Sequence, residues 1–481
     1  MRYKKILLIS PRFFKGRFRL AIHPLAGLGY IAESLRANGF AVSVFDMNLG
    51  YDHRDLERRI SGFRPDIIGF TVMTFGHRDL YALVERIKAA HPGIKIMAGG
   101  PHISTLRGKV LEDCPAVDYG IILEGEQSVV ELCMGADPDK IQGLVHRRGG
   151  EIAVNDFRNF IADLDKLHFP KYELFELNKY PTGQIGIVTS RGCPYECIYC
   201  PVNSAIGRQY RQRSAQGIVD EIEYWHKKGR REILMLDDNF TLSRKRVEEI
   251  CGLLSRKAFK GISLKCPNGV RADKVDYDLL KMMREAGFDM LSFGVEAASD
   301  RVLKTIKKGE DASTIEKGIR DACSLGFDVD LFFLIGSPGE NLKDVESSFS
   351  LARRYPVRSA KFYNIVPFPG TELFGWIGDN GYFLRAAEDI INNASHFINE
   401  PCFFTPEMSA GDRKWAFEMG QKISREIRRK FIERKLKGPS FLRKAFSRIY
   451  TSPLAEAAVN NNAMVIRLKE GIRRGAGLWQ N

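Results

Sequence analysis

The residues best suited to chemistry are three cysteines in the segment SRGCPYECIYC, at Cys193, Cys197 and Cys200. Three thiolates so close together suit zinc or an iron-sulfur cluster, but a closed structural zinc site takes four protein ligands. The nearest histidines, His168 and His226, are each about two dozen residues away. Either a remote residue completes the coordination shell, or one metal position is left open.

The composition is typical of a globular protein from a reducing compartment. The 481 residues, 44% hydrophobic and 27% charged, suffice for about two to four domains. Nine irregularly spaced cysteines favour metal ligands or reactive thiols over a disulfide framework. No apolar run approaches the roughly 20 residues of a spanning helix, and the N-terminal one is too short for a signal peptide. We expect a cytoplasmic protein that lies at most on a membrane surface.

The net charge of +14 is concentrated towards the C-terminus. Residues 411–481 contain 17 Lys/Arg and 6 Asp/Glu, a surplus of +11 that leaves +3 for the first 410 residues. Nucleic-acid binding requires a basic face on the body of a domain, so we expect no nucleic-acid partner.

The elements that position functional residues begin with five strand patterns at 4–10, 41–46, 66–73, 95–100 and 119–125. Helical patterns lie among them at 25–38, 52–61, 77–90 and 127–134. This alternation predicts an α/β, doubly wound, Rossmann-like domain over 1–142, with ligands beyond the carboxyl ends of its parallel strands. That edge carries Thr71, Thr74, Gly99, Gly100, His102, Glu124, Gly125 and Glu126. Taken alone, the GGPH turn favours a purely local role for its glycines.

A hairpin and linker over 143–183, with a turn at Gly149-Gly150, precede a second β/α series over 184–400. Its strand patterns are at 185–190, 232–238, 262–269, 290–296, 329–336 and 360–368. Six such units form three-quarters of an eight-fold β/α barrel, which builds its chemistry at the carboxyl ends of the strands.

Polar or glycine-rich residues follow each of these six strands. In strand order they are the cysteine cluster, Asp237 with Asp238, Asn268 with Arg271, Glu296, the turn GSPGE from Gly336, and the turn PFPG from Pro367. A single acid there could merely cap the next helix, but six such strand ends indicate a functional edge.

The spacing C-x3-C-x2-C, with Tyr199 before the last cysteine, resembles the signature of the radical S-adenosylmethionine (SAM) superfamily. Together with the first domain, the resemblance covers roughly residues 1–400. Over this length the sequence resembles the cobalamin-binding branch of the superfamily, which includes radical methylases and the anaerobic magnesium-protoporphyrin ester cyclase. The phrases that carry it are PLAGLGYIAESLRANGFAVSVFD, AGGPH, LDDNFT, FGVEAASDRVLKTIKKG, LIGSPGE and PFPGTELF.

The resemblance implies that Cys193, Cys197 and Cys200 bind three irons of a 4Fe-4S cluster and leave the fourth iron to SAM. An electron from a donor such as flavodoxin or ferredoxin would then cleave SAM to methionine and a 5′-deoxyadenosyl radical. A zinc site completed by a remote cysteine is the alternative for these thiolates.

Further SAM-binding residues follow from positions in the family. Tyr199 would pack by the adenine, Glu296 would bind the ribose hydroxyls, and Gly336 belongs to the cofactor-binding set. Asp237 or Asp238 stands where many relatives carry a Gly-Gly-Glu turn for the methionine amino group, a turn absent here. The same reasoning makes Arg271 a candidate partner for the SAM carboxylate, with a surface salt bridge as the alternative.

The first domain resembles cobalamin-binding domains with one departure. The motif D-x-H-x-x-G, through which some relatives supply a histidine to cobalt, is absent, since neither His23 nor His102 has that spacing. We therefore assign no cobalt ligand. Cobalamin binding is favoured, and a scaffold that has lost cobalamin is the alternative.

The resulting hypothesis is methyl transfer to an unactivated carbon of a small-molecule or lipid-like substrate, with both cofactors brought to one substrate atom by proximity. Two alternatives stay open. One is a radical SAM cyclase or dehydratase that does not use cobalamin. The other is a non-catalytic metal-binding or nucleic-acid-binding protein.

The region 401–481 is predicted to be basic and helical. Apolar residues recur every four positions at Trp415, Met419, Ile423, Ile427 and Phe431, which indicates an amphipathic helix up to residue 436, and 441–449 repeats the pattern. Such helices either pack on the barrel with a solvated basic face or make peripheral contact with an anionic membrane.

Overall fold

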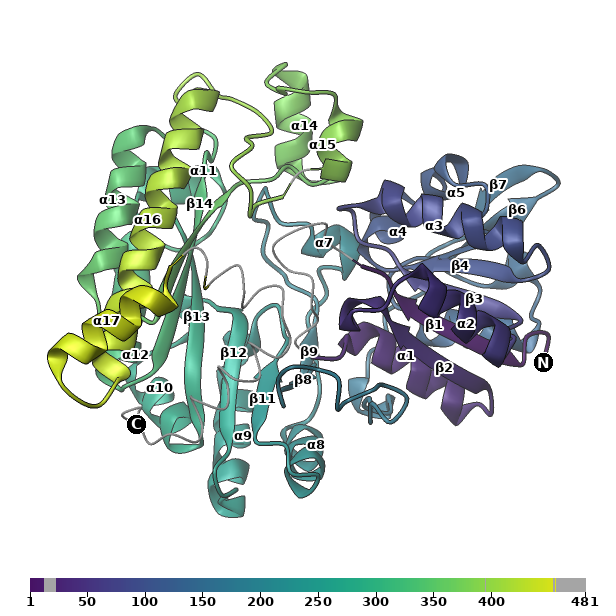
Figure 1. Cartoon of the computed structure of the whole chain (residues 1–481), viewed down its shortest axis with the longest axis horizontal. Coiled ribbons are helices and arrows are strands. Elements are labelled where there is room, and N and C mark those ends of the chain that lie inside the picture. The colour runs from purple at the N-terminus through teal and green to yellow at the C-terminus, as the bar shows by residue number, and fades with distance from the viewer. Residues whose placement is uncertain (13–22, 394, 453–454, 456–481) are drawn as a thin grey trace. The chain divides into compact units, whose positions relative to one another are not determined.

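The computed structural model describes residues 1–12, 23–393, 395–452 and 455, so the end of the predicted basic region lies outside the described residues. The chain divides into two compact units (Figure 1). Unit 1 comprises Met1–Pro181, Pro201–Arg211 and Ile391–Asn393, and unit 2 comprises Thr182–Cys200, Gln212–Ile390 and Ala394–Asn481.

Unit 1 is built on a seven-stranded sheet in the order β2-β1-β3-β4-β5-β6-β7. The first five strands are parallel and confirm the predicted alternation, while β6 and β7 form the predicted hairpin and extend the sheet antiparallel to β5. The strands are β1 (Lys5–Ser10), β2 (Ala41–Asp46), β3 (Ile67–Thr71), β4 (Lys95–Gly99), β5 (Tyr119–Ile121), β6 (Leu144–Arg148) and β7 (Glu151–Val154).

Helices cover both faces of this sheet because alternate strand residues point to opposite sides. Leu7 and Ile9 of β1 join one apolar core with helices α2 to α5, whereas Leu8 faces α1 and α6. In the sheet, β2 lies on one side of β1 and β3 lies on the other. The direction in which successive strands are added therefore reverses between β1 and β3. Sheets of this kind bind ligands at that point. The helices are α1 (Ala26–Ala37), α2 (His53–Phe63), α3 (His77–Ala90), α4 (Pro101–Leu106), α5 (Lys109–Asp113), α6 (Glu126–Met134) and α7 (Val202–Ala205).

Unit 2 contains a six-stranded parallel sheet in the order β15-β14-β13-β12-β11-β8, which confirms the second β/α series. Its strands are β8 (Ile185–Ile187), β11 (Glu232–Met235), β12 (Ser263–Val270), β13 (Phe288–Glu296), β14 (Asp328–Ile335) and β15 (Ser359–Asn364), and a separate short pair comprises β9 (Ser190–Arg191) and β10 (Arg211–Gln212). Because the strands are parallel, all six carboxyl ends lie at one edge.

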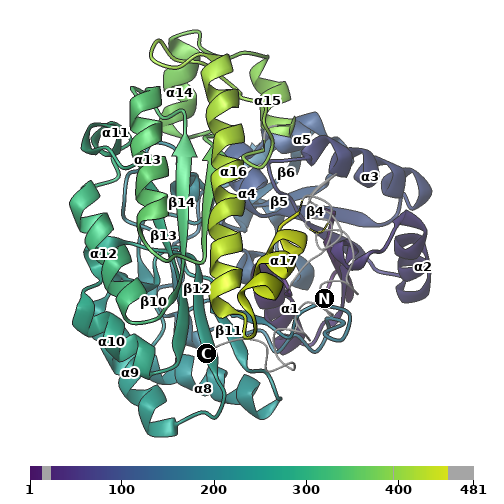
Figure 2. The ribbon, with the colours of Figure 1, turned by 60° about the vertical axis from the view of Figure 1, so that its left-hand side comes forward.

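The helices of unit 2 alternate with these strands and then continue beyond β15. They are α8 (Ala215–Lys227), α9 (Arg244–Lys257), α10 (Tyr277–Glu285), α11 (Asp300–Thr305), α12 (Ala312–Ser324), α13 (Leu342–Arg354), α14 (Glu372–Asp379), α15 (Ala387–Asn393), α16 (Ala410–Lys435) and α17 (Ser440–Tyr450). The long helix α16 runs along β15 and α13 (Figure 2). Within the described residues, no helix combines the length and the apolar character needed to cross a membrane.

The two C-terminal helices are confirmed, but the predicted apolar stripe of α16 is only partly buried. Ile423, Ile427 and Phe431 are buried, whereas Trp415 is 42% exposed and Phe417 is buried in its place. A strict four-residue spacing advances about 40° per step around a helix of 3.6 residues per turn, so its two ends cannot share one face.

Candidate functional site

The three cysteines lie on a loop that follows β8 and β9 at the carboxyl edge of the unit 2 sheet. All three are half-buried, and none forms a disulfide bond. Ile198 anchors the loop, because its backbone N–H donates to the carbonyl of Ile306 (3.2 Å) and its carbonyl accepts from the N–H of Leu373 (2.9 Å). These two backbone hydrogen bonds therefore hold the middle of the loop in place.

Burial and nearby charges act in opposite directions on the thiols. Burial raises the pKa of Cys197, and the nearby cations Lys308 and Arg271 oppose that rise. Among the described residues, no three His, Cys, Asp or Glu side chains converge on a single metal ion. A 4Fe-4S cluster takes one thiolate per iron, so its ligands need not converge on one point. This set of donors fits such a cluster.

Asp237 and Asp238 end β11 in different environments. Asp237 is 2% exposed and accepts hydrogen bonds from the Thr189 N–H (2.6 Å), the Thr189 hydroxyl and the Ser190 hydroxyl (2.5 Å each). Asp238 has no hydrogen-bond partner among the described residues, and burial together with the charge of Asp237 raises its pKa to about 6. Asp237 braces the scaffold, whereas Asp238 is available to a cationic ligand.

Asn239 is a polar residue at this edge that the sequence patterns did not single out. Its side chain is 2% exposed, and neither the amide nitrogen nor the amide oxygen has a hydrogen-bond partner within the described part of the chain. Buried polar groups are nearly always hydrogen-bonded, so this amide points to a polar ligand at the site.

Glu296 ends β13 in a strained backbone conformation. Its φ of +62° lies in the left-handed region, where a non-glycine residue costs of order 1 kcal/mol and often marks a functional position. The pairing of β13 with β14 shifts register between Gly294 and Glu296, and the Glu296 carboxylate lies over Gly294. A Cβ at position 294 would lie only 2.6 Å from the Glu296 Oε1, so only glycine leaves room for the carboxylate there.

A buried lysine holds this carboxylate. Lys308, 6% exposed, places Nζ 3.0 Å from the Glu296 Oε1 and 3.6 Å from the Glu310 Oε2. Burial alone would lower the pKa of Lys308, but the two carboxylates raise it. The Tyr199 hydroxyl also bonds to Glu296, and burial and that charge raise the pKa of Tyr199. The structure thus joins Tyr199 and Glu296, both predicted to contact SAM.

Arg271 is engaged by its own surroundings. Its guanidinium donates to the carbonyls of Lys308 (2.7 Å) and Gly309 (3.1 Å) and to Asp273 (2.9 Å), and it lies 3.6 Å from the centre of the Tyr195 ring. These contacts tie β12 to the cysteine loop and to the segment after α11. Arg271 therefore forms the salt bridge of the alternative prediction, with Asp273, but at 7% exposure it is buried and not at the surface.

Gly336 lies after β14 in a turn that packs against α16. Its φ is +87°, its N–H donates to the Glu340 Oε2 (2.6 Å), and a Cβ there would clash with the guanidinium of Arg413. Arg413 is 1% exposed and lies 4.1 Å from the centre of the Phe403 ring. Burial raises the pKa of Glu340 to about 7. The turn therefore anchors α16 to the sheet.

The carboxyl edge of unit 1 contains an apolar cavity of about 70 Å³. Thr71, Gly99 and Gly125 line it together with Gly69 and Met97, and the aliphatic side chains of β1, α1 and α6 complete its walls. The cavity lies where the strand order reverses. An apolar cavity with glycines at the strand ends, at the point where such sheets bind ligands, suits the entry of an apolar part of a cofactor.

The other predicted residues of this edge have internal partners. The His102 ring is fully buried, bonds to the Tyr81 hydroxyl (2.9 Å) and stacks on His77, and burial lowers its pKa to about 3. Glu124 accepts from Arg211 (2.6 Å) and from the N–H of Ile161 (2.8 Å).

The remaining three predicted residues of this edge are Glu126, Thr74 and Gly100. Glu126 is buried in the first turn of α6, and the Thr74 carbonyl bonds to the His77 ring. Gly100, with a φ of +100°, lies at the start of α4. The cavity therefore brings together Thr71, Gly99 and Gly125 but not these three residues, His102 or Glu124.

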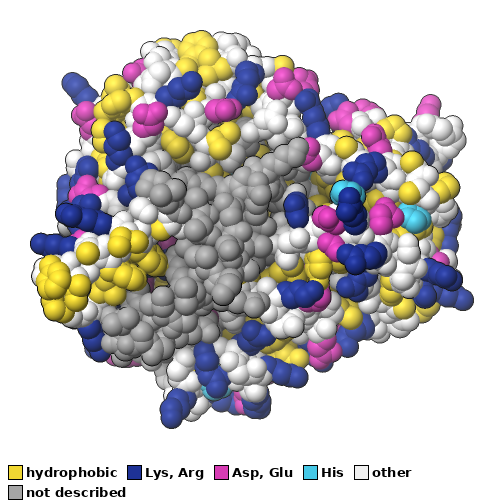
Figure 3. Space-filling model, viewed as in Figure 1, with side chains coloured by type: hydrophobic (Ala, Val, Ile, Leu, Met, Phe, Trp, Pro, Cys, Tyr) yellow, Lys and Arg dark blue, Asp and Glu magenta, His cyan; other side chains and the backbone are white. Residues whose placement is uncertain are grey.

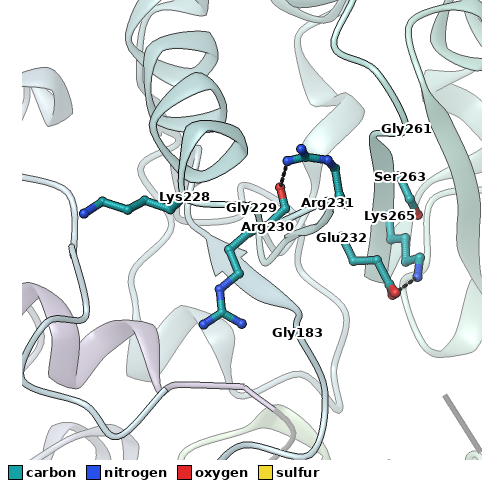
Figure 4. Close-up of a pocket in the computed structure, with 9 residues that line it drawn as sticks. All are labelled: Gly183, Lys228, Gly229, Arg230, Arg231, Glu232, Gly261, Ser263 and Lys265. Atoms are coloured by element: carbon teal, nitrogen blue, oxygen red, sulfur yellow. Dashed lines mark hydrogen bonds and ion pairs between the residues drawn. The ribbon is translucent and has the colours of Figure 1, made fainter. Parts of the chain in front are cut away.

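A pocket of about 500 Å³ in unit 2 lies at the other ends of the strands, where β11 and β12 begin (Figure 4). Lys228 and Arg230 point apart, and Lys265 pairs with Glu232 (Nζ to Oε2, 2.5 Å). Because these cations do not converge, we assign this pocket no role in the site.

Sequence reasoning missed Asn239, Lys308 and Arg413. Asn239 lies within the phrase LDDNFT, and Lys308 lies within the phrase FGVEAASDRVLKTIKKG. Both phrases carried the family resemblance, and their place in these phrases was the signal that could have identified the two residues. Arg413 had none, because 77 positions separate it from Gly336 along the chain.

Comparison with known proteins confirms the resemblance. Residues 187–352 match the radical SAM superfamily and residues 14–133 match the B12 binding domain. An uncharacterised methyltransferase of Pyrococcus horikoshii is 28% identical over 416 residues, covering 83% of this chain and 90% of that protein. The anaerobic magnesium-protoporphyrin IX monomethyl ester cyclase of Rubrivivax gelatinosus is 26% identical over 395 residues, covering 78% and 70%.

A solved structure shares the fold. The cobalamin-dependent S-adenosylmethionine radical enzyme OxsB, with aqua-cobalamin and SAM bound, covers 98% of this chain and 75% of its own, with a TM-score of 0.74 and 17% identity. The two domain matches imply a 4Fe-4S cluster, SAM and cobalamin as cofactors. The three clustered thiols, the unpartnered Asn239 amide and the apolar cavity fit these groups.

Proposed function

Because the chain belongs to the radical SAM superfamily and carries a B12-binding domain, we propose that it is a cobalamin-dependent methyltransferase acting on an unactivated carbon. The observation that carries this proposal is the presence, on one chain, of the three-cysteine loop of unit 2 and the apolar cavity of unit 1. When bound, SAM at the cluster supplies a radical that removes hydrogen from the substrate, and cobalamin supplies the methyl group. The substrate is a small or lipid-like molecule.

In this proposal different residues at the carboxyl edge of the unit 2 sheet bind the cluster and the different groups of SAM. Cys193, Cys197 and Cys200 hold the cluster. Asp238, with its raised pKa, gains a favourable partner in an ammonium group, because an opposite charge stabilises the carboxylate.

Lys308 and the Tyr199 hydroxyl hold the Glu296 carboxylate in position, and its remaining lone pairs can accept from the ribose hydroxyls. The Asn239 amide supplies a donor and an acceptor to the same ligand. Arg271 acts as a positioning residue, since its guanidinium already holds the backbone carbonyls and the Tyr195 ring.

The first experiment tests the methyl route without knowing the substrate. The full chain is purified and reconstituted without oxygen, loaded with cobalamin and incubated with reductant and SAM carrying a deuterated methyl group. We expect 5′-deoxyadenosine and a heavy methyl group on the extracted cobalamin. SAM cleavage without any label on cobalamin would reject the methyltransferase.

Cysteine variants test the cluster assignment. Cys197→Ser should remove the visible absorption of the cluster and SAM cleavage, because serine does not replace a thiolate on iron. The matched control is Cys323→Ser, at another free, half-buried cysteine of unit 2. Equal cluster content in the two variants contradicts the assignment.

The cavity is tested by filling it. A Cβ at Gly99 would meet no atom within 4 Å, so Gly99→Leu can fold while its side chain enters the cavity. We expect at least a tenfold loss of cobalamin affinity, measured by absorption titration. Gly62→Leu on α2, also free of contacts, is the control and should bind as the wild type does.

A second candidate function is cyclisation. The match to the Rubrivivax cyclase over 78% of the chain favours it specifically. The same reconstituted enzyme distinguishes the two, because a cyclase would cleave SAM and leave cobalamin without the heavy methyl group. An electron donor of the flavodoxin or ferredoxin class would serve either reaction.

A further inference from the structure

Helix α17 docks on α16 through its polar edge. Ser447 is its one buried side chain among the described residues, and its hydroxyl donates to the Glu433 Oε1 (2.7 Å). Arg443, on the same side, donates to the Glu433 carbonyl (3.3 Å). Tyr450, at the end of α17, also packs against the apolar cluster of Phe431, Ile432 and Leu436, but the main apolar face of α17, which such a helix usually buries, is exposed.

The apolar face of α17 consequently points to solvent. At about 100° per residue, Phe441, Leu442, Ala445, Phe446 and Ile449 fall within roughly 140° of its circumference. The exposed fractions are 69% for Phe441, 54% for Leu442, 36% for Phe446 and 71% for Ile449. Apolar side chains gather over this helix at the left of Figure 3. Contiguous apolar surface of this kind marks an interaction site.

A basic hollow of about 280 Å³ lies beside this face, between α16 and α17. Its cations are Lys422, Arg425, Arg429 and Arg448. Its one acidic lining residue, Glu426, already pairs with Arg353 and Lys430. Among the described residues, Lys422, Arg425 and Arg448 have no ion-pair partner. The hollow therefore presents cations to an anionic ligand.

We propose that α17 inserts its apolar face into the surface of an anionic lipid bilayer while the basic hollow receives a lipid phosphate. An exposed apolar arc flanked by Lys and Arg is the arrangement that binds such surfaces, each basic residue strengthening binding roughly fivefold. A second copy of the chain is disfavoured as the occupant, because a symmetric pairing would bring the two basic hollows together. The proposal uses no cofactor-binding residue and goes beyond the proposed function.

The test measures cosedimentation of the cofactor-loaded full chain with vesicles. One set is phosphatidylcholine, and the other contains about one-third phosphatidylglycerol. The apolar variant is Phe441→Ser with Ile449→Ser, and the charge variant is Arg425→Glu with Arg448→Glu. The control makes the same kinds of change at exposed sites of α10, Met282→Ser with Lys281→Glu. SAM cleavage and cobalamin content are measured on the same samples, so loss of the enzyme is distinguishable from loss of the surface.

We expect the wild type and the control to bind the anionic vesicles at least tenfold more tightly than the neutral ones. Both the apolar variant and the charge variant should lose at least tenfold on anionic vesicles. Wild-type protein that ignores anionic vesicles, or variants that bind as well as the wild type, would overturn the proposal. A wild-type dimer that dissociates in the apolar variant would also overturn it, because the occupant would then be a second copy of the chain. If only a chain shortened to end at Ser452 bound vesicles, the occupant would be the C-terminal tail.

Discussion

The buried contact between Lys308 and Glu296 yields the sharpest prediction, tested by Lys308→Met. The substitution keeps an apolar stem of similar length and removes the ammonium that lies 3.0 Å from Glu296 and 3.6 Å from Glu310. The side chains of the three residues are 7%, 10% and 0% exposed, in that order. Removing one partner of a buried ion pair costs about 3–5 kcal/mol, because the other charge stays buried without compensation.

The control for this prediction is an ion pair of similar length at the surface. Lys307 lies 2.7 Å from Glu372 on α14, and the two side chains are 51% and 56% exposed. Because exposed pairs contribute about 0–1 kcal/mol, Lys307→Met should change stability by no more than that. The difference between the two variants isolates burial from distance.

The assay is urea unfolding of the full chain followed by tryptophan fluorescence. Three of the four tryptophans, Trp225, Trp376 and Trp415, lie within the described residues and belong to unit 2, the unit that contains the substitution. Lys308→Met should lower the free energy of unfolding by about 3–5 kcal/mol. Adding Glu296→Gln should recover part of the loss. Equal destabilisation by Lys308→Met and Lys307→Met would refute the reasoning.

Two further predictions concern the turn after β14. Gly336→Ala should cost about 2–4 kcal/mol by urea unfolding, since a Cβ clashes with Arg413 and φ is +87°, whereas Gly326→Ala, at a φ of +78° with open space, should cost about 1 kcal/mol. Burial raises the pKa of Glu340 to about 7 in the folded chain, so its contribution to stability is largest below the unfolded value of 4.5 and is lost as the pH rises through 7. Glu340→Gln should remove a decline of roughly 2–4 kcal/mol between pH 4.5 and 8, and an unchanged decline would exclude Glu340 as its cause.

Local patterns in the sequence were sufficient to predict the cysteine loop and the strand series. The spacing of Cys193, Cys197 and Cys200 and the continuous apolar runs of strands such as β1 depend on residues close together in the chain. Parallel strands place their carboxyl ends at one edge, so the approximate location of Asp238 and Glu296 followed from the same patterns. The periodicity of α17 likewise predicted an amphipathic helix.

Tertiary structure alone decided which of these residues have free polar groups. Asp237 and Asp238 are neighbours in sequence. Thr189 and Ser190, nearly 50 positions away, donate hydrogen bonds to Asp237 but not to Asp238. The same holds for α17, whose apolar face is solvent-exposed because Ser447 meets Glu433 of α16. Periodicity determines that a helix has two faces, but which face is buried depends on the partner that long-range packing brings against it.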